Sequence, residues 1–131
     1  MPQPKLDSTF IVLDAKQDAT LMPVTPSIYQ DLDANFNHFA GCLLVAEYTF
    51  SDDWPSWERH PNGDETLYLV SGEATLFLYA DGVERQIEFN TPGSFAIIPK
   101  GTWHTAKVNT NCTILFITPG EGTQNGPDPR L

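Results

Sequence analysis

Hydrophobic positions along the chain fall in short runs, and turn residues separate these runs at intervals of about eight to twelve positions. No stretch sustains the period of about 3.6 residues that marks an amphipathic helix. Short strands at this spacing are typical of a β-sandwich or a β-barrel. The pattern predicts extended segments over residues 9–13, 21–24, 43–50, 57–60, 65–70, 74–79, 83–89, 94–98, 103–108 and 113–118. One helical turn is predicted over residues 27–32.

Two predicted turns set how neighbouring strands connect. Asp81 and Gly82 stand between two apolar runs and predict a two-residue hairpin, because both residue types tolerate the positive φ values of that turn. Residues 71–73 predict a second tight turn, across which the strand 65–70 is expected to pair with the strand 74–79.

The length of 131 residues suits one domain. Within it, residues 1–40 are expected to supply N-terminal strands and an irregular segment that pack on a barrel. Residues 41–118 are expected to form the barrel core, and residues 119–131 a flexible C-terminal tail. The tail is rich in Gly and Pro, so we expect it to form neither a strand ladder nor part of the core.

The balance of charge is acidic, with 17 Asp and Glu against 7 Lys and Arg and a net charge of -10. This charge repels phosphate backbones and anionic lipid headgroups, so nucleic acid and membrane surfaces are not expected as partners. Cys42 and Cys112 each lie in or beside an apolar run and are expected to be buried free thiols.

The N-terminal segment lacks the apolar stretch of a signal peptide, and no apolar run approaches the roughly 18 residues of a spanning helix. These features predict a cytoplasmic protein. An exposed edge strand is a liability that dimerisation removes, and residues 9–13 are the predicted edge. The protein is therefore expected to be a homodimer.

Four side chains are candidates for a metal site. Glu58 and His60 are two positions apart, so on an extended strand both leave by the same face. Glu65 begins the next strand, and His104 opens a later one. Two imidazoles and two carboxylates suit zinc, iron, manganese, nickel or cobalt better than an ion that prefers oxygen alone. From spacing alone the alternative stays open, since a histidine near a strand start is more often a surface or hydrogen-bonded residue than a ligand.

The first of these segments resembles a motif of the cupin superfamily. That motif has His-x-His, then four residues, Glu, six residues and Gly, and here its positions hold Glu58, His60, Glu65 and Gly72. Glu58 departs from the pattern, because the family usually has histidine there. A carboxylate keeps a donor atom but adds negative charge, so the identity of the metal stays open.

A second segment resembles the other cupin motif, which has Gly, five residues, Pro-x-Gly, two residues and His. Its positions hold Gly93, Pro99, Gly101 and His104, while Val108 stands where the family has Asn. The resemblance implies an all-β, double-stranded β-helix or jelly-roll antiparallel barrel. It also implies a divalent transition metal (zinc, iron, manganese, nickel or cobalt) held by Glu58, His60, Glu65 and His104.

Strict alternation places Leu67 and Leu69 on the same face as Glu65. Ala106 and Val108 likewise share a face with His104, so the metal is expected beside apolar walls, which could equally be plain core.

The tryptophans and the remaining histidine are not expected to bind the metal. Trp103 is expected to point away from the metal, and Trp54 and Trp57 are expected either to line the mouth of the barrel or to pack in its core. His38 matches no motif position and is expected to be structural.

The resemblance implies a mononuclear metal enzyme of the oxygenase, isomerase or decarboxylase type that acts on a small organic molecule. Glu58 would either complete the metal shell or act as the catalytic base. A non-catalytic ligand-binding or sensor protein is the alternative, because one fold supports many roles. A metal-independent epimerase with His60 as base is disfavoured for nucleotide sugars, since the chain has only Arg59, Arg85 and Arg130 to bind a diphosphate.

Overall fold

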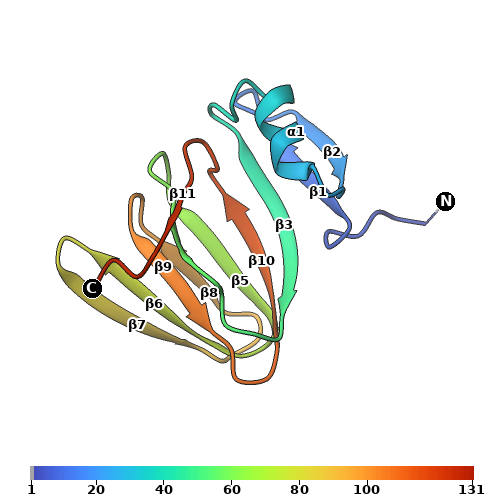
Figure 1. Ribbon diagram of the computed structural model, residues 1–131. Helices are drawn as coiled ribbons and strands as arrows, with labels where there is room; N and C mark the ends of the chain where they lie inside the picture. Colours follow the sequence, from blue (N-terminus) through green and yellow to red (C-terminus); the bar gives the residue numbers. More distant parts are fainter. Residues whose placement is uncertain (1) are drawn as a thin grey trace.

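The computed structural model describes residues 2–131, which form two antiparallel β-sheets and one short helix (Figure 1). The elements are β1 (Thr9–Leu13), β2 (Ala19–Pro23), α1 (Ile28–Asn35), β3 (Leu43–Phe50), β4 (Trp57–Arg59), β5 (Glu65–Gly72), β6 (Ala74–Ala80), β7 (Val83–Phe89), β8 (Phe95–Ile98), β9 (Trp103–Lys107), β10 (Cys112–Thr118) and β11 (Gln124–Gly126). The predicted all-β jelly-roll class is confirmed, and the predicted helical turn is the start of a two-turn helix.

The strands are divided between a six-stranded sheet, β2-β1-β3-β10-β5-β8, and a five-stranded sheet, β11-β4-β9-β6-β7. Figure 1 shows the two sheets facing each other, with β1, β2 and α1 to one side. Within residues 2–131 no ladder joins one sheet to the other, so the predicted barrel is open rather than closed. No helix of this described part is long and apolar enough to cross a membrane.

The hairpin predicted at Asp81 and Gly82 is confirmed. Both residues have positive φ values, 51° and 76°, and β6 pairs with β7 along its whole length. These two φ values match the right-handed twist of the strands that the turn joins.

The pairing predicted across residues 71–73 is wrong, because β5 and β6 lie in different sheets. Gly72 has a φ of +77°, and a Cβ at this position would lie 2.1 Å from the backbone oxygen of Asn111. Only glycine allows this close approach, which lets the chain leave one sheet and enter the other. The turn is therefore a crossing between sheets.

Two further expectations about the strands are corrected. Residues 9–13 are not an edge, since β1 lies between β2 and β3, and β2 occupies the edge of the sheet. The predicted dimer contact through residues 9–13 is therefore wrong, and dimerisation itself stays a prediction. The expectation that residues 119–131 form no ladder is also wrong, because β11 pairs with β4.

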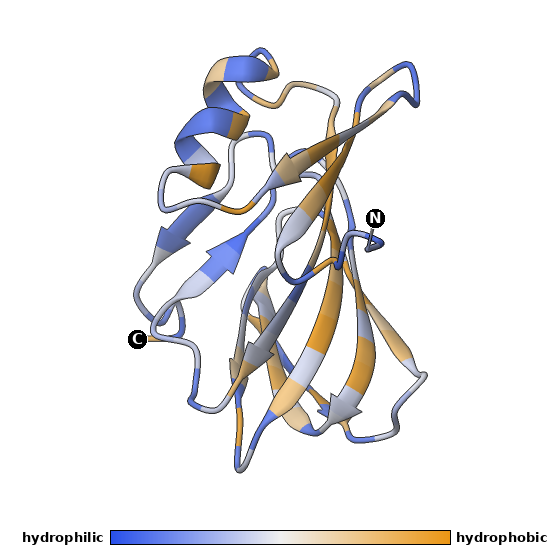
Figure 2. Ribbon diagram, turned by 90° about the vertical axis from the view of Figure 1, so that its right-hand side faces the viewer, coloured by the Kyte–Doolittle hydropathy of each residue, from blue (hydrophilic) through white to orange (hydrophobic). Residues whose placement is uncertain are grey.

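Two hydrophobic clusters support these elements. One lies between the sheets and includes Leu67, Leu69 and Ile114, and the other joins β1 to the helix through Phe10 and Leu32. Hydrophobic positions concentrate on the strands, whereas the loops are mostly hydrophilic (Figure 2). Both cysteines are free and buried, as predicted.

Candidate metal centre

The four candidate ligands come from three strands and one loop that meet at the same place. Glu58 lies on β4 directly opposite His104 of β9, so the register brings these two side chains together. His60 follows β4 by one residue, and its carbonyl accepts a hydrogen bond of 3.0 Å from the backbone N–H of Gly101. Glu65 is the first residue of β5. Residues far apart in the sequence thus face one point.

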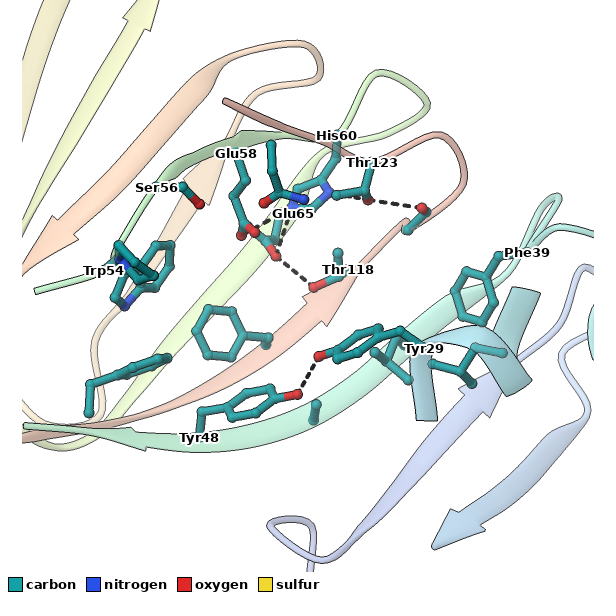
Figure 3. Close-up of a pocket in the computed structure, with 18 of the residues that line it drawn as sticks. Tyr29, Phe39, Tyr48, Trp54, Ser56, Glu58, His60, Glu65, Thr118 and Thr123 are labelled. Atoms are coloured by element: carbon teal, nitrogen blue, oxygen red, sulfur yellow. Dashed lines mark hydrogen bonds and ion pairs between the residues drawn. The ribbon is translucent and has the colours of Figure 1, made fainter. Parts of the chain in front are cut away.

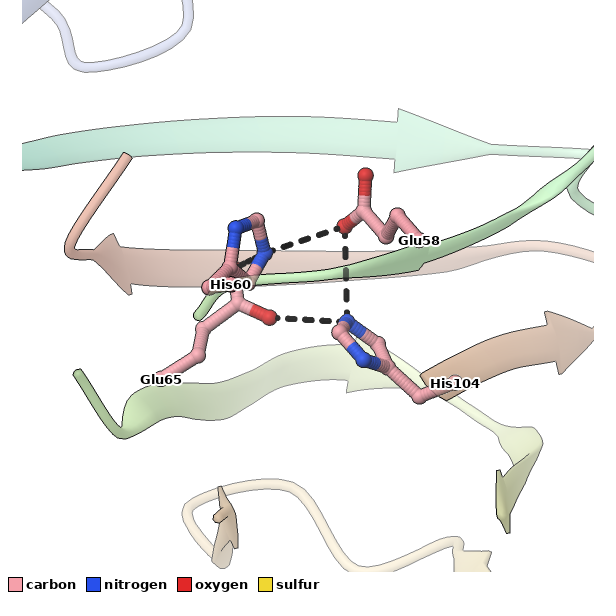
Figure 4. A group of neighbouring side chains, drawn as sticks. All are labelled: Glu58, His60, Glu65 and His104. Carbon is pink, nitrogen blue, oxygen red and sulfur yellow. Dashed lines mark ion pairs between the residues drawn. The ribbon is translucent and has the colours of Figure 1, made fainter. Parts of the chain in front are cut away.

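The ligand atoms of Glu58, His60, Glu65 and His104 all lie within 4.8 Å of one another (Figure 4). Nε2 of His104 is 3.0 Å from Oε1 of Glu65 and 3.4 Å from Oε1 of Glu58. Nε2 of His60 is 3.3 Å from Oε2 of Glu65 and 3.5 Å from Oε1 of Glu58. One divalent ion among these atoms would contact two nitrogen and two oxygen donors.

Three of these side chains are almost completely buried. The exposed fractions are 5% for His60, 2% for Glu65 and 1% for His104, against 26% for Glu58. Apart from these contacts with one another, Nε2 of both histidines and Oε1 of Glu65 have no hydrogen-bond partner among the described residues. Because buried polar atoms are nearly always satisfied, these three orphaned atoms fit a bound cation.

Hydrogen bonds at the far side of each imidazole aim Nε2 at the centre. Nδ1 of His104 lies 3.1 Å from the carbonyl oxygen of Thr102, which can only accept, so Nδ1 carries the proton. Nδ1 of His60 lies 2.8 Å from the hydroxyl of Thr123, and that hydroxyl itself donates to the carbonyl of Gly120. In the neutral form of both rings, the lone pair is therefore on Nε2, as in metal-binding histidines.

Glu65 is held in the same way, since the hydroxyl of Thr118 donates a 2.6 Å hydrogen bond to its Oε2. The sequence pattern gave no prediction for Thr118, Thr123 or Thr102. Only Thr102 offered a local signal, two residues before His104. The other two lie 53 and 63 positions from their partners, so no local pattern identifies them.

Without a metal the cluster is a set of charged pairs. Burial opposes charge on His60 and His104, but the adjacent carboxylates outweigh it and raise the pKa values to about 9 and about 10. Burial also opposes ionisation of Glu58, yet the two imidazoles lower its pKa to about 2, and they lower the pKa of Glu65 as well. A metal ion must therefore compete with protons on both histidines.

A cavity of about 900 Å³ opens beside this cluster, and Glu58, His60 and Glu65 form part of its wall. Figure 3 shows Trp54, Tyr48 and Tyr29 along the rest of it. The Tyr29 and Tyr48 hydroxyls are hydrogen-bonded to each other, which links α1 to β3. The size lies within the range of small-molecule sites, which are mostly apolar with few polar groups.

Comparisons with solved structures agree with this architecture. Oxalate decarboxylase of Bacillus subtilis, a protein with Mn(II) centres, matches with a TM-score of 0.55 and 21% identity over 65% of this chain and 23% of its own. Oxalate oxidase matches with a TM-score of 0.53 and 16% identity over 62% of this chain and 44% of its own. Both of these proteins are cupins.

This chain has the cupin fold. It aligns with less than half the length of either oxalate enzyme. Protein NMB1881 from Neisseria meningitidis also matches, with a TM-score of 0.47 and 24% identity over 58% of this chain and 72% of its own. A scan against protein-family models found no match, and a search of curated proteins found none either.

The four residues predicted to be apolar walls or plain core are core. Leu67 and Leu69 are buried on the face of β5 that carries Glu65, and Ala106 and Val108 are buried in the same hydrophobic cluster, but none of the four lines the cavity. Trp103 precedes His104 on β9, so its side chain leaves by the opposite face, and the Arg59 guanidinium lies 5.0 Å from its ring centroid.

The two other tryptophans and His38 lie in different surroundings. Trp54 lines the cupin cavity, whereas Trp57 is buried beneath Arg130, whose guanidinium is 4.9 Å from the ring centroid. His38 lies outside the metal cluster and pairs with Asp33 at the surface. This contact agrees with the structural role expected for His38. The His38 side chain also borders the cavity.

Proposed function

We propose that this cupin is a mononuclear metal enzyme that acts on a small organic molecule. The observation that carries the proposal is the convergence of three buried polar atoms, from His60, Glu65 and His104, that have no partner outside the cluster and lie beside a cavity of about 900 Å³. A structural ion would need no cavity, and a plain binding pocket would not need orphaned imidazole nitrogens. The two features together favour chemistry on a bound ligand.

His60, Glu65 and His104 would hold the ion, because their positions are set by hydrogen bonds to other residues. When bound, a divalent transition metal would supply Lewis-acid polarisation of a substrate oxygen. The donor set suits zinc, iron, manganese, nickel or cobalt. The Mn(II) centres of the oxalate decarboxylase make manganese the first ion to test.

Glu58 is proposed to have a second role. It is the most exposed of the four residues and borders the cavity, and only its Oε1 contacts the two histidines. Its carboxylate is therefore placed to complete the metal shell or to accept a proton from a substrate in the cavity.

The reaction type is proposed from the resemblance to be oxygenation, isomerisation or decarboxylation. The test is to purify the protein without added metal, measure its metal content by mass spectrometry, and assay small organic compounds with and without oxygen, oxalate among them. Metal close to one ion per chain together with turnover of any compound supports the proposal. Bound metal without turnover would favour a sensor, and no metal at all would refute the proposal.

A further inference from the structure

One wall of the cavity is a continuous aromatic surface that begins at the metal centre. The ring of Trp54 lies 6.2 Å from the ring of His104, and 5.3 Å from the ring of Phe50. Phe116 is 5.9 Å from Trp54, and Tyr48 is 6.0 Å from Phe50. These centroid separations are those of packed aromatic pairs, so the wall is formed before a ligand arrives. A ligand with an apolar body would bury its surface against it.

Every charged side chain on the cavity wall is acidic, apart from the histidines. The carboxylates are those of Asp33, Asp52, Asp53, Glu58 and Glu65. None of the seven Lys and Arg residues, all of which fall within residues 2–131, lines this cavity. A divalent ion would offset Glu58 and Glu65. Of the other three carboxylates, Asp33 pairs with His38 and Asp53 accepts a hydrogen bond from the backbone N–H of Val108, whereas Asp52 has no such partner among residues 2–131.

Two basic groups on the strands of the metal centre make contacts outside the large cavity. Nε of Arg59 donates to the Gln124 side chain at 2.6 Å while its guanidinium covers Trp103. Lys107 lies over Phe77 on the wall of a smaller pocket, which adjoins the large cavity at residues 53–56. Outside the metal centre, an anion in the large cavity would therefore meet carboxylates and no Lys or Arg side chain, an unfavourable exchange for its hydration shell.

We infer that the cavity binds a small organic molecule with an apolar or aromatic body and no negative charge, so its substrate class is uncharged or cationic. The identification of this ligand as a substrate rests on the proposed function, but its charge preference does not. Aromatic faces attract cations as well as apolar groups, and the remaining carboxylates favour a cation further. Simple carboxylates and phosphates are therefore expected to bind less tightly than uncharged or cationic ligands of the same size.

The test uses three probes that share a phenyl ring and a two-carbon spacer but differ in charge: 2-phenylethanol, 2-phenylethylamine and 3-phenylpropanoate. Titration calorimetry of the protein as purified gives a Kd for each, and metal content is measured on the same samples. We expect the uncharged and the cationic probe to bind at least about tenfold more tightly than the anion. Equal or tighter binding of 3-phenylpropanoate would overturn the inference, as would failure of all three to bind.

Two matched pairs of variants connect the result to this cavity. Phe50→Leu removes an aromatic ring from the wall and should weaken the first two probes several-fold, whereas Phe95→Leu, on an exposed residue of β8, should not. Asp52→Lys should tighten 3-phenylpropanoate, whereas Asp7→Lys makes the same change of net charge outside the cavity and should leave it unchanged. Similar effects within either pair would count against the assignment.

The two proposals fail in different ways. Absence of metal from every sample would refute the proposed metal enzyme, whereas the three Kd values would still test the inferred charge preference. Bound metal with a preference for the anion would keep the proposed enzyme and eliminate the inferred class of ligand.

Discussion

The protein has two regions where histidine meets carboxylate, and they differ in burial rather than in distance. His38 and Asp33 form a contact of 3.1 Å on the surface, with side chains 82% and 60% exposed. In the candidate metal centre the contacts are 3.0 to 3.5 Å, but His60, Glu65 and His104 are almost completely enclosed. Water surrounds the first pair, whereas the second encloses Nε2 of both histidines and Oε1 of Glu65 away from solvent, so only the second needs a cation, a metal ion or protons on the imidazoles, to satisfy buried polar atoms.

Removal of one imidazole from each region should have the most unequal effects. We expect His60→Ala and His104→Ala each to abolish metal binding while leaving a folded but less stable protein, because each leaves buried carboxylates without a partner. Metal content by mass spectrometry and circular dichroism would measure both effects. Full metal occupancy in both variants would show that the ligand assignment is wrong.

The matched substitution His38→Ala should change neither the metal content nor the fold. Exposed ion pairs contribute about 0 to 1 kcal/mol, so its effect on the free energy of unfolding should not exceed that range. Chemical denaturation would measure it.

Within the metal centre, the two carboxylates should differ from each other. Glu65 is buried and bonded to Thr118, whereas Glu58 is partly exposed. Glu65→Gln is expected to weaken metal affinity by more than about 100-fold, beyond the range of an outer contact, and Glu58→Gln by less. Competition with a chelator of known affinity would rank them. The reverse order would make Glu58 the principal carboxylate ligand.

Above about pH 6.5, the stability of the metal-free protein and the affinity for metal should change in opposite directions with pH. In the metal-free protein, the raised pKa values of His60 and His104 stabilise the fold fully below about pH 6.5, and this contribution is lost as pH rises through 9 to 10. The lowered pKa of Glu58 contributes stability above about pH 4.5 that is lost toward pH 2. Stability from this cluster is therefore greatest between about pH 4.5 and 6.5.

Metal affinity should instead rise with pH up to about 9 to 10, by about tenfold per unit for each proton displaced. Thermal unfolding of chelated and metal-loaded protein across pH would measure both trends. If the metal affinity did not change between about pH 6 and 8, no proton would be displaced on binding, and the assignment of protonated imidazoles in the metal-free protein would be wrong.

A smaller effect is expected from the outer contact to His60. Thr123→Val removes the hydroxyl that accepts from Nδ1, and we expect metal affinity to fall by about tenfold, the low end for such contacts. Thr123→Ser should restore it, since serine retains the hydroxyl. Thr113→Val, at a residue whose hydroxyl bonds only to Thr49 on the surface, is the control and should bind metal normally. An equal loss in the control would refute a positioning role for Thr123.

Local features of the sequence were enough for most strands and for the identity of the four candidate ligands. Hairpin chemistry is local, so Asp81 and Gly82 predicted the β6–β7 turn correctly. The alternation that places Leu67 and Leu69 beside Glu65 is local too. The ligand set came from the spacing shared with the cupin motifs.

The tertiary structure decided what depends on residues far apart. It assigned β5 and β6 to different sheets, because Gly72 passes close to Asn111, and it joined β11 to β4. It also brought Thr118 and Thr123 to the ligands and assembled the aromatic wall beside them. Such contacts are set by long-range packing and hydrogen bonding, and no periodicity within one segment encodes them. The chain's own pattern thus determined which side chains can bind a metal, and only the fold determined what surrounds them.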